Sequence, residues 1–504
     1  MVLTEKPALG DDLEALPGSL PENDQGGFFM LQPLSDSDHS GQSGFQKIVD
    51  GFLLQSGLPF AGVLSSEKIE RIFRKHGGLF GKDGIYNTSI VLWAFLGQVL
   101  RDGKEASCQF AVAGIISFCL QVGRTAPTKD TGDYCRARAK LSEPALRELS
   151  AEITNEAEQQ ADAAWLWKER HAKLADGFTF TMPDTEKNQA EFPHPRTQTK
   201  GVGLPIARCV AILSLATAMV MDVVLGPYKG KETGESALLR QMMASLMAGD
   251  VVVFDRYYCS FMMIALLLNH RVDVCARLHH LRRADFRKGR RLGKYDHVIV
   301  WTRPACPLWM DEATYATIPA TLELRELRYA IVEKGKRTKS ITVVTTLTDV
   351  DAYTKEDIAE LYGYRWSSEL DIRSIKDSLN LGHVRCKSPD MVRIEFRTTF
   401  LAYNLIRLTA ASAALRSNQK PRTISFTSTC QFVLAGWAVH VSGLMTPAAM
   451  RKESDELMKR IAACRVGDRP GRLEPRVIKR RRHGYPLMQK PRHVLRAELR
   501  KHCT

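Results

Sequence analysis

The spacing of apolar residues changes along the chain and predicts helices first and strands afterwards. From Ser66 to about residue 170 apolar positions recur with the helical period, and Ser142 can cap a helix that carries Pro144 in its first turn. At about residue 172 the period becomes two, with Phe178 and Phe180 alternating with threonines, which is typical of a strand. A helical domain is therefore followed by the start of a sheet.

The middle of the chain alternates short apolar runs with helical segments. Residues 206–225 can supply two strands, and residues 235–247 have the pattern of a helix closed by Gly249. The uncharged run Val251–Phe254 predicts a strand that is buried on both faces. Strand-like segments return within residues 271–350, after a basic and irregular stretch. This alternation indicates a mixed α/β sheet with a β-rich insertion.

The last third of the chain is predicted to be mainly helical. Thr354 and Asp357 have the spacing of a capping box, and the helix that follows them is the longest well-marked one in the sequence. The chain is helical again beyond Asn404 and ends in a strongly basic tail. The predicted organisation is a disordered tail over residues 1–45, a helical domain over 46–170, an α/β core over 171–270 and 351–410, a β-rich insertion over 271–350, and a helical, basic region over 411–504.

The net charge indicates which class of partner the protein binds, and the cysteine pattern indicates in which cellular compartment it works. The formal net charge of +15 implies a polyanionic partner, with nucleic acid ahead of anionic lipid. The 11 cysteines stand singly, which argues against a disulfide framework and against a zinc ribbon. The first twenty residues do not resemble a secretion signal, and Asp222 interrupts the most apolar stretch, Cys209–Leu225. We expect a cytoplasmic protein that binds nucleic acid and has no membrane role.

The helix after the capping box carries a stripe of side chains suited to chemistry on phosphates. The stripe contains hydroxyl, cationic, carboxylate and indole groups: Tyr362, Arg365, Trp366, Glu369, Arg373 and Lys376. At 100° per residue, the tyrosine, the first arginine, the glutamate and the lysine fall within an arc of about 60°. On a generic helix such a stripe is most often a solvated face of mixed charge.

The spacing of these residues resembles a family signature. Y, two residues, R, three residues, E, six residues, K is similar to the signature of the insertion sequence 4 family of bacterial DDE transposases, and the flanking LYGYRWSSELDIRSIKDSLNLGHVRCKSP and LAYNLIRL are also similar. The resemblance implies a ribonuclease H-like core with three catalytic acids, of which Glu369 is the third. DGFTFTMPDT and GDVVVFDRYY resemble the first and second catalytic segments, which identifies Asp176 and Asp255. Phe178 departs from the small or hydroxyl residue that the family more often has there.

Three converging carboxylates suit a two-metal mechanism of phosphodiester cleavage. Asp176, Asp255 and Glu369 would hold two Mg²⁺ or Mn²⁺ ions, because these cations prefer hard oxygen ligands. Asp184 is the alternative first acid. The remaining candidates are predicted to be structural or solvated: Asp222 and Asp250 as surface residues at strand ends, and His279 and His280 as solvated or phosphate-facing side chains.

The same resemblance implies contacts to double-stranded DNA at terminal repeats and at a target. Tyr362, Arg365 and Lys376 would hold phosphates near the scissile end, with Trp366 or Trp301 as a candidate to receive a flipped base. Basic residues of the helical domain that resemble the family's DNA-binding region are Arg136, Arg138 and Lys140. RRADFRKGRR and VIKRRRHG could neutralise further phosphates.

The resemblance also implies how the enzyme would work in the cell. Two element ends must be processed together, so we expect at least a homodimer, in the cytoplasm of a bacterium and associated with the nucleoid. The alternatives are a structure-specific nuclease on the same fold and a non-catalytic DNA-binding descendant of a transposase. The presence of an acid at all three matched positions argues against a non-catalytic descendant. An assay of strand transfer would distinguish a transposase from a nuclease.

Overall fold

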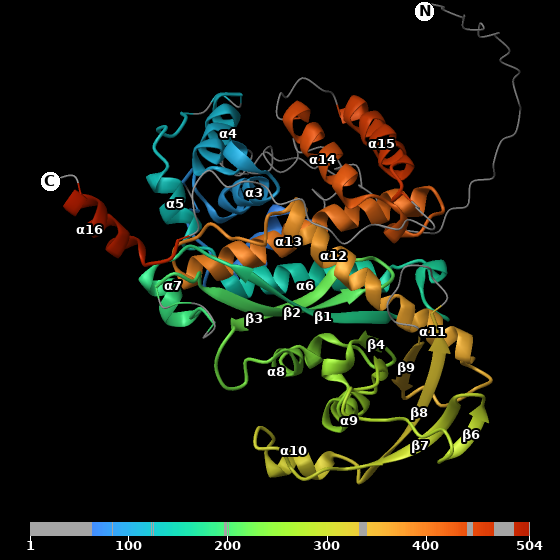
Figure 1. Ribbon diagram of the computed structural model, residues 1–504. Helices are drawn as coiled ribbons and strands as arrows, with labels where there is room; N and C mark the ends of the chain where they lie inside the picture. Colours follow the sequence, from blue (N-terminus) through green and yellow to red (C-terminus); the bar gives the residue numbers. More distant parts are fainter. Residues whose placement is uncertain are drawn as a thin grey trace, which may run out of the picture.

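The computed structural model describes residues 63–82, 84–121, 123, 125–195, 199, 201–331, 340–440, 447–467 and 488–502. The tail predicted for residues 1–45 and the VIKRRRHG segment lie outside these ranges. Within them, helices pack on both faces of one large sheet (Figure 1). No helix in the described part of the chain is long and apolar enough to cross a bilayer.

Nine strands of the described residues form one mixed sheet, in the order β3-β2-β1-β4-β5-β9-β8-β7-β6. Their bounds are β1 (Ala172–Thr181), β2 (Ile206–Ser214), β3 (Val220–Pro227), β4 (Val251–Phe254), β5 (Asp273–Arg277), β6 (Arg290–Gly293), β7 (Asp296–Thr302), β8 (Thr321–Ala330) and β9 (Ser340–Thr345). The pairs β1–β4 and β4–β5 are parallel, and the other pairs are antiparallel. The predicted mixed α/β class is confirmed.

The helices and 3-10 turns fall into groups that follow the chain. The N-terminal group is α2 (Ser66–Lys75), α3 (Thr88–Val99), η1 (Gly103–Ala106), α4 (Cys108–Gln121), α5 (Gly132–Arg138), α6 (Glu143–Gln159) and η2 (Ala163–Trp165). Those between strands are α7 (Glu186–Glu191), α8 (Glu235–Arg240), η3 (Met243–Ser245), η4 (Arg256–Tyr258), α9 (Phe261–Asn269) and α10 (Glu312–Thr317). The C-terminal group is α11 (Lys355–Gly363), α12 (Arg365–Ser378), α13 (Pro389–Arg416), η5 (Pro421–Thr423), α14 (Phe426–His440), α15 (Pro447–Ala463) and α16 (Arg492–His502).

Strand β1 separates two apolar cores. Leu174 and Phe180 face the core that α13 covers, where Phe180 stacks on Phe396 at 5.5 Å between ring centroids. Ala175 faces the other core, together with residues of α8 and α9, and Figure 1 shows these two helices on the opposite side of β1–β3 from α12 and α13. Because neighbouring strand residues point to opposite faces, Asp176 faces the α12 side.

Several helix starts and strands lie where local sequence signals predict them. The Ser142 hydroxyl accepts a hydrogen bond from the backbone of Ala145 and begins α6, and the Thr354 capping box begins α11. The two strands predicted within residues 206–225 are β2 and β3, although β3 runs on to Pro227. The strand predicted at Val251–Phe254 is β4, and all four of its residues are buried.

Two predicted helices differ from the structure. The helix predicted for residues 235–247 ends at Arg240, because the hydrogen bonds beyond it change to the tighter 3-10 pattern, as from Met242 N to Leu239 O. The helix predicted from Thr354 is divided at Tyr364 into α11 and α12, and the longest helix described is α13 with 28 residues. The signature residues therefore lie on two helices.

The strands expected in the β-rich insertion continue the central sheet. Strand β5 pairs in parallel with β4, and β9 pairs with β5 on its other edge. The remaining strands, β8, β7 and β6, follow outward in that order. The sheet therefore extends without a break from the edge strand β3 to the edge strand β6.

Candidate active site

Two of the three predicted acids lie at the same level on neighbouring parallel strands. The register pairs Ala175 of β1 with Phe254 of β4, so the next residue on each strand is Asp176 and Asp255 respectively. Strand β4 ends at Phe254, whereas β1 continues to Thr181. The two carboxylates therefore stand where the parallel pairing stops and the edge of β1 becomes accessible.

The third acid is brought to Asp176 by helix α12. Arg365 donates from Nη2 to Glu369 Oε1 at 2.7 Å, and its Nη1 lies 3.8 Å from Asp176 Oδ2. The hydroxyl of Ser368 donates to the same Asp176 oxygen at 2.9 Å. These contacts bring the first turn of α12 against β1 and place one guanidinium between two of the predicted catalytic carboxylates.

Burial and neighbouring charges shift the protonation of this cluster. Burial raises the pKa of Asp176, and the nearby charge of Glu369 adds to the rise, whereas Ser368 and Arg365 oppose it. Burial disfavours the charged form of Arg365, but the hydrogen bond to Glu369 and the nearby negative charges together outweigh burial, so the pKa of Arg365 is raised. The arginine stays cationic and offsets the repulsion between the two acids.

Asp255 differs from the other two acids in its contacts. Its backbone begins the turn η4, but its side chain makes no capping hydrogen bond. In the ranges that the structure describes, its carboxylate has no hydrogen-bond donor and no ion pair. Also within these ranges, no three side chains of the His, Cys, Asp and Glu types lie close enough together to hold a metal ion.

The other signature residues divide into buried and accessible ones. Tyr362 is buried near the end of α11, whereas the side chains of Trp366 and Arg373 are exposed on α12. Lys376 lies with Nζ 5.9 Å from the ring centroid of Phe178. Phe178 itself packs on α13, which gives the departure from the family pattern a structural role in the core.

The basic residues predicted for the helical domain lie in three different settings. Arg138 is partly buried, donates to Gln98 Oε1 at 2.9 Å and stacks over the ring of Phe95. Arg136 is exposed and paired with Asp133, and Lys140 is exposed. The predicted residues thus do not form one continuous patch.

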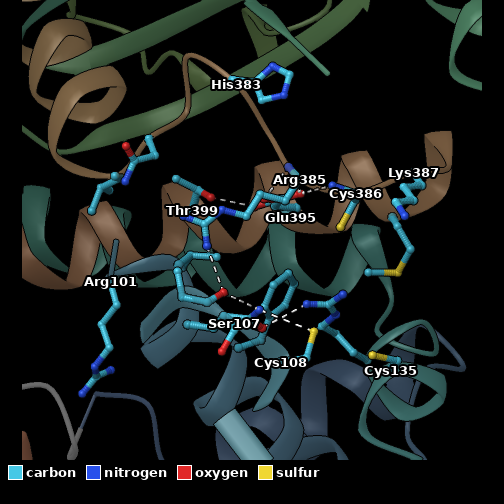
Figure 2. A pocket seen from close by; sticks show the side chains of 18 of the residues that line it. Arg101, Ser107, Cys108, Cys135, His383, Arg385, Cys386, Lys387, Glu395 and Thr399 are labelled. Atoms are coloured by element: carbon cyan, nitrogen blue, oxygen red, sulfur yellow. Dashed lines mark hydrogen bonds between the residues drawn. The ribbon is translucent and has the colours of Figure 1, made fainter. Parts of the chain in front are cut away.

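Arg138 lines a cavity between the helical domain and the segment that follows α12. The cavity has a volume of about 760 Å³, and Figure 2 shows side chains from α3, α4 and α5 on one side and residues 383–399 on the other. Its cationic lining residues are Arg101, Arg138, Lys187, Arg385 and Lys387. Among the lining residues, Glu395 is the acidic one, and its carboxylate accepts hydrogen bonds from the backbone of Arg385 and Cys386.

The alternative candidates take up other contacts. Asp184 is exposed beyond the end of β1 and accepts from Gln189, so it does not face Asp255 or α12. The prediction that Asp222 and Asp250 are surface residues is wrong, because only 9% of the Asp222 side chain is exposed in its pair with Arg147, and Asp250 is buried 4.0 Å from the buried Lys173.

The aromatic candidates in the insertion also have local partners. Trp301 is buried and donates to Glu326 at 3.1 Å, which gives it a core role. His279 and His280 lie against each other with ring centroids 4.3 Å apart. Trp366, with 54% of its surface exposed, is the accessible tryptophan of the two that were considered for a flipped base.

Ser368 was missed in the sequence. On an ideal helix it falls about 60° from Arg365 and outside the stripe of signature residues, on the apolar side. It is nevertheless buried against Asp176, because β1 approaches α12 from that side. A hydroxyl at a predicted core position was the signal that could have found it.

Comparisons with known proteins agree with the signature. Residues 167–405 match the family model described as transposase DDE domain. The chain is 25% identical over 441 residues to the transposase InsG for insertion sequence element IS4 from Escherichia coli (strain K12), which covers 85% of this chain and 93% of that protein. A piggyBac transposase synaptic complex with hairpin DNA aligns with 73% of this chain and 76% of that chain, at 10% identity and a TM-score of 0.38. The chain is therefore similar to DDE transposases over residues 167–405 and to the transposase of insertion sequence element IS4 over most of its length.

Proposed function

We propose that this transposase cuts DNA at the ends of its insertion sequence and joins them to target DNA, with Asp176, Asp255 and Glu369 as catalytic acids on a ribonuclease H-like core. The observation that carries the proposal is the meeting of three elements. The parallel register sets Asp176 beside Asp255, and α12 places Glu369 within reach of the same arginine that contacts Asp176. Acids from separate parts of the chain are thereby gathered at one strand end.

The chemistry of the three carboxylates suits two divalent cations such as Mg²⁺ or Mn²⁺, although the side chains would have to move closer together to hold them. Asp255 keeps both carboxylate oxygens free of partners in the described part of the chain, and all three acids offer hard oxygen ligands. When bound, such ions would activate a water or a 3′-hydroxyl as nucleophile and stabilise the leaving oxygen. Arg365 would exchange its contact with Glu369 for a DNA phosphate, because a guanidinium binds carboxylates and phosphates in the same geometry.

The accessible cations suggest a path for the DNA beside the acids. Arg373 and Lys376 lie on α12 beyond Glu369, and the segment after α12 continues to Arg385 and Lys387 at the cavity. Phosphates contacted along this path would fix the position of the duplex without reading its sequence. Trp366 lies on the accessible side of α12 and could stack on a base that leaves the duplex at the cleavage point.

The helical domain supplies further candidate contacts. Arg136 and Lys140 are accessible for phosphates of the terminal repeat, whereas Arg138 would act from within the cavity. We propose that two chains act together on the two element ends, as a homodimer in the cytoplasm. A structure-specific nuclease on the same fold remains the alternative activity, and it would release cut ends without joining them.

The experiment is cleavage and strand transfer on a terminal-repeat duplex with Mg²⁺ or Mn²⁺. Loss of a direct metal ligand should cost more than the roughly 10–100-fold of a residue that only supports a ligand, so Asp255→Ala and Glu369→Ala should each lose more than about 100-fold in cleavage. Asp184→Ala is the matched control and should cleave like the wild type. Cleavage within about tenfold of wild type in either active-site variant would contradict the assignment, and cutting without joining would favour the nuclease.

A further inference from the structure

One edge of β1 is open directly after Asp176. Strand β4 pairs with β1 only from Ala172 to Ala175. On this edge the next pairing in the described chain is the isolated bridge between Thr181 and His383. The open stretch therefore begins beside Asp176 and Gly177, where the turn η4 and the helix α8 approach the sheet.

A carboxylate that the three-acid assignment does not include occupies this opening. Glu235, the first residue of α8, lies so close to Gly177 that a Cβ atom on this glycine would be 2.7 Å from Oε1 and 2.8 Å from Oε2. Real Cβ atoms do not approach other atoms so closely, so a side chain at position 177 would push the flexible end of Glu235 aside. The absence of a side chain at Gly177 is what allows Glu235 to reach the strand.

Glu235 is not held there by a cation. In the part of the chain that the structure describes, no Lys, Arg or His forms an ion pair with its carboxylate, and the same is true of Asp255. A glutamate at the start of a helix is favoured by the helix dipole, but α8 has only six residues. The dipole explains a negative charge at this helix start, and it does not explain the close approach to Gly177.

A buried hydroxyl points into the same space. Tyr258 is 1% exposed, and its hydroxyl has no hydrogen bond of ordinary geometry within the described residues. It lies beside Glu235, and the charges of Glu235, Asp176 and Asp255 add to burial in raising the pKa of Tyr258. A buried polar group without a partner is rare and calls for one. The hydroxyl is thus a donor aimed at a group of carboxylates that have capacity to spare.

We propose that Glu235 is a fourth carboxylate of the divalent-cation site formed by Asp176, Asp255 and Glu369, and that Tyr258 orients it by donating a hydrogen bond. Glu369 reaches the strand end from the α12 side of the sheet, and Glu235 reaches it from the α8 side. Because β4 stops at Phe254, no strand separates the two approaches. The inference rests on the proposed catalytic site and adds a ligand to it.

The test measures Mn²⁺ binding to the full-length protein without DNA, by electron paramagnetic resonance of the free ion. Glu235→Gln should weaken the tighter binding step by about tenfold or more, because even the loss of a residue that only supports a metal ligand costs roughly 10–100-fold in affinity. Gly177→Ala should weaken it similarly while leaving every charge in place, because the added Cβ displaces Glu235. Glu232→Gln removes an exposed acid three residues earlier, one that pairs with Arg240, and should bind Mn²⁺ like the wild type.

Tyr258→Phe tests the orienting role separately. It should weaken Mn²⁺ binding less than Glu235→Gln does, and combined with Glu235→Gln it should add nothing further, because Tyr258 acts through the glutamate. Wild-type Mn²⁺ affinity in both Glu235→Gln and Gly177→Ala overturns the proposal. A Glu235→Gln variant that unfolds at a lower temperature in EDTA but binds Mn²⁺ with wild-type affinity also overturns the proposal, because Glu235 would then be a structural residue. The Asp255→Ala variant separates failure of the Glu235 proposal from failure of the three-acid site. If this variant binds Mn²⁺ with wild-type affinity, the proposed metal site itself is overturned.

Discussion

Two acids that stand two residues apart on helix α12 have opposite surroundings. Asp371 is 2% exposed and receives two arginines, Arg407 on one oxygen at 2.9 Å and Arg422 on the other at 2.6 Å. Glu369 has a side chain that is 35% exposed and shares the single Arg365 with Asp176. Two residues along a helix correspond to about 200°, so Asp371 faces the arginines of the C-terminal region, whereas Glu369 lies on the side where Arg365 also contacts Asp176 of β1.

The difference separates a structural ion cluster from a candidate active site. Around Asp371 the donors are also satisfied, because Arg422 donates to the carbonyls of Ser214 and Leu215. At the strand end the acids outnumber their donors, and Asp255 has no partner among the described residues. Carboxylates with spare lone pairs in a half-buried setting are prepared to receive a cation or a substrate, whereas saturated ones hold the fold together.

The largest effect is expected when the saturated cluster is broken. Asp371→Ala leaves two arginines, one of them buried, without their acid, and should lower the free energy of unfolding by about 3–5 kcal/mol. Glu369→Ala removes a half-exposed pair, which is worth at most about 1 kcal/mol, and also relieves repulsion with Asp176. Urea unfolding of both variants measures the contrast. Equal losses in the two variants would mean that both acids are structural.

A second saturated cluster should respond to pH. Glu158 is buried beside Lys173, and although burial opposes its charge, Lys173 and His171 lower the pKa of Glu158 to about 2. Because the folded pKa lies below the unfolded one, the stabilisation is present above about pH 4.5 and is lost as the pH falls toward 2. The loss is on the order of 2–3 kcal/mol. Unfolding of the wild type and Glu158→Gln across this range checks it, and parallel curves for the two proteins would refute it.

The sequence predicted those parts of the molecule that depend on neighbours along the chain. The cap at Ser142, the capping box at Thr354 and the buried strand β4 follow from short-range rules, and the signature spacing identified α12. The closeness of Glu235 to Gly177 arises from pairing and packing between segments far apart in sequence. No local periodicity encodes such a contact.

The errors have the same physical origin. Asp222 and Asp250 look like strand-end residues on the surface, but arginine and lysine side chains from other elements bury them. The break at Tyr364 also escaped the pattern, although Gly363 at the end of α11 is a poor helix former and was a local signal for it. Sequence reasoning therefore located the candidate acids and could not tell which of their neighbours are saturated.

Arg365 is the donor that Asp176 and Glu369 share, so its loss affects both acids at the strand end. Arg365→Ala should reduce cleavage of the element end by about tenfold or more, through loss of a charge-assisted contact. The same substitution should change the free energy of unfolding by less than about 1 kcal/mol, since the ion pair is partly exposed. Arg365→Lys should recover only part of the cleavage, because one ammonium cannot match the two arms that contact Glu369 and Asp176. Full recovery of cleavage in Arg365→Lys would mean that Arg365 contributes only its positive charge.

The smallest effect is expected at Lys376, which is partly buried on α12 and lies near the ring of Phe178. Its Nζ is 5.9 Å from the ring centroid, a cation–π contact worth about 0.5–1 kcal/mol at most, so Lys376→Ala should barely change stability. If it contacts a phosphate, its loss removes about one unit from the slope of log binding constant against log salt concentration. Lys294 lies at the same 5.9 Å from the ring of Tyr295, in the turn between β6 and β7, and Lys294→Ala is the matched control. The measurement is binding to a terminal-repeat duplex over a salt series. An unchanged slope for Lys376→Ala, or an equal drop for both variants, would show that Lys376 does not contact DNA. Its role would then be limited to the contact with Phe178.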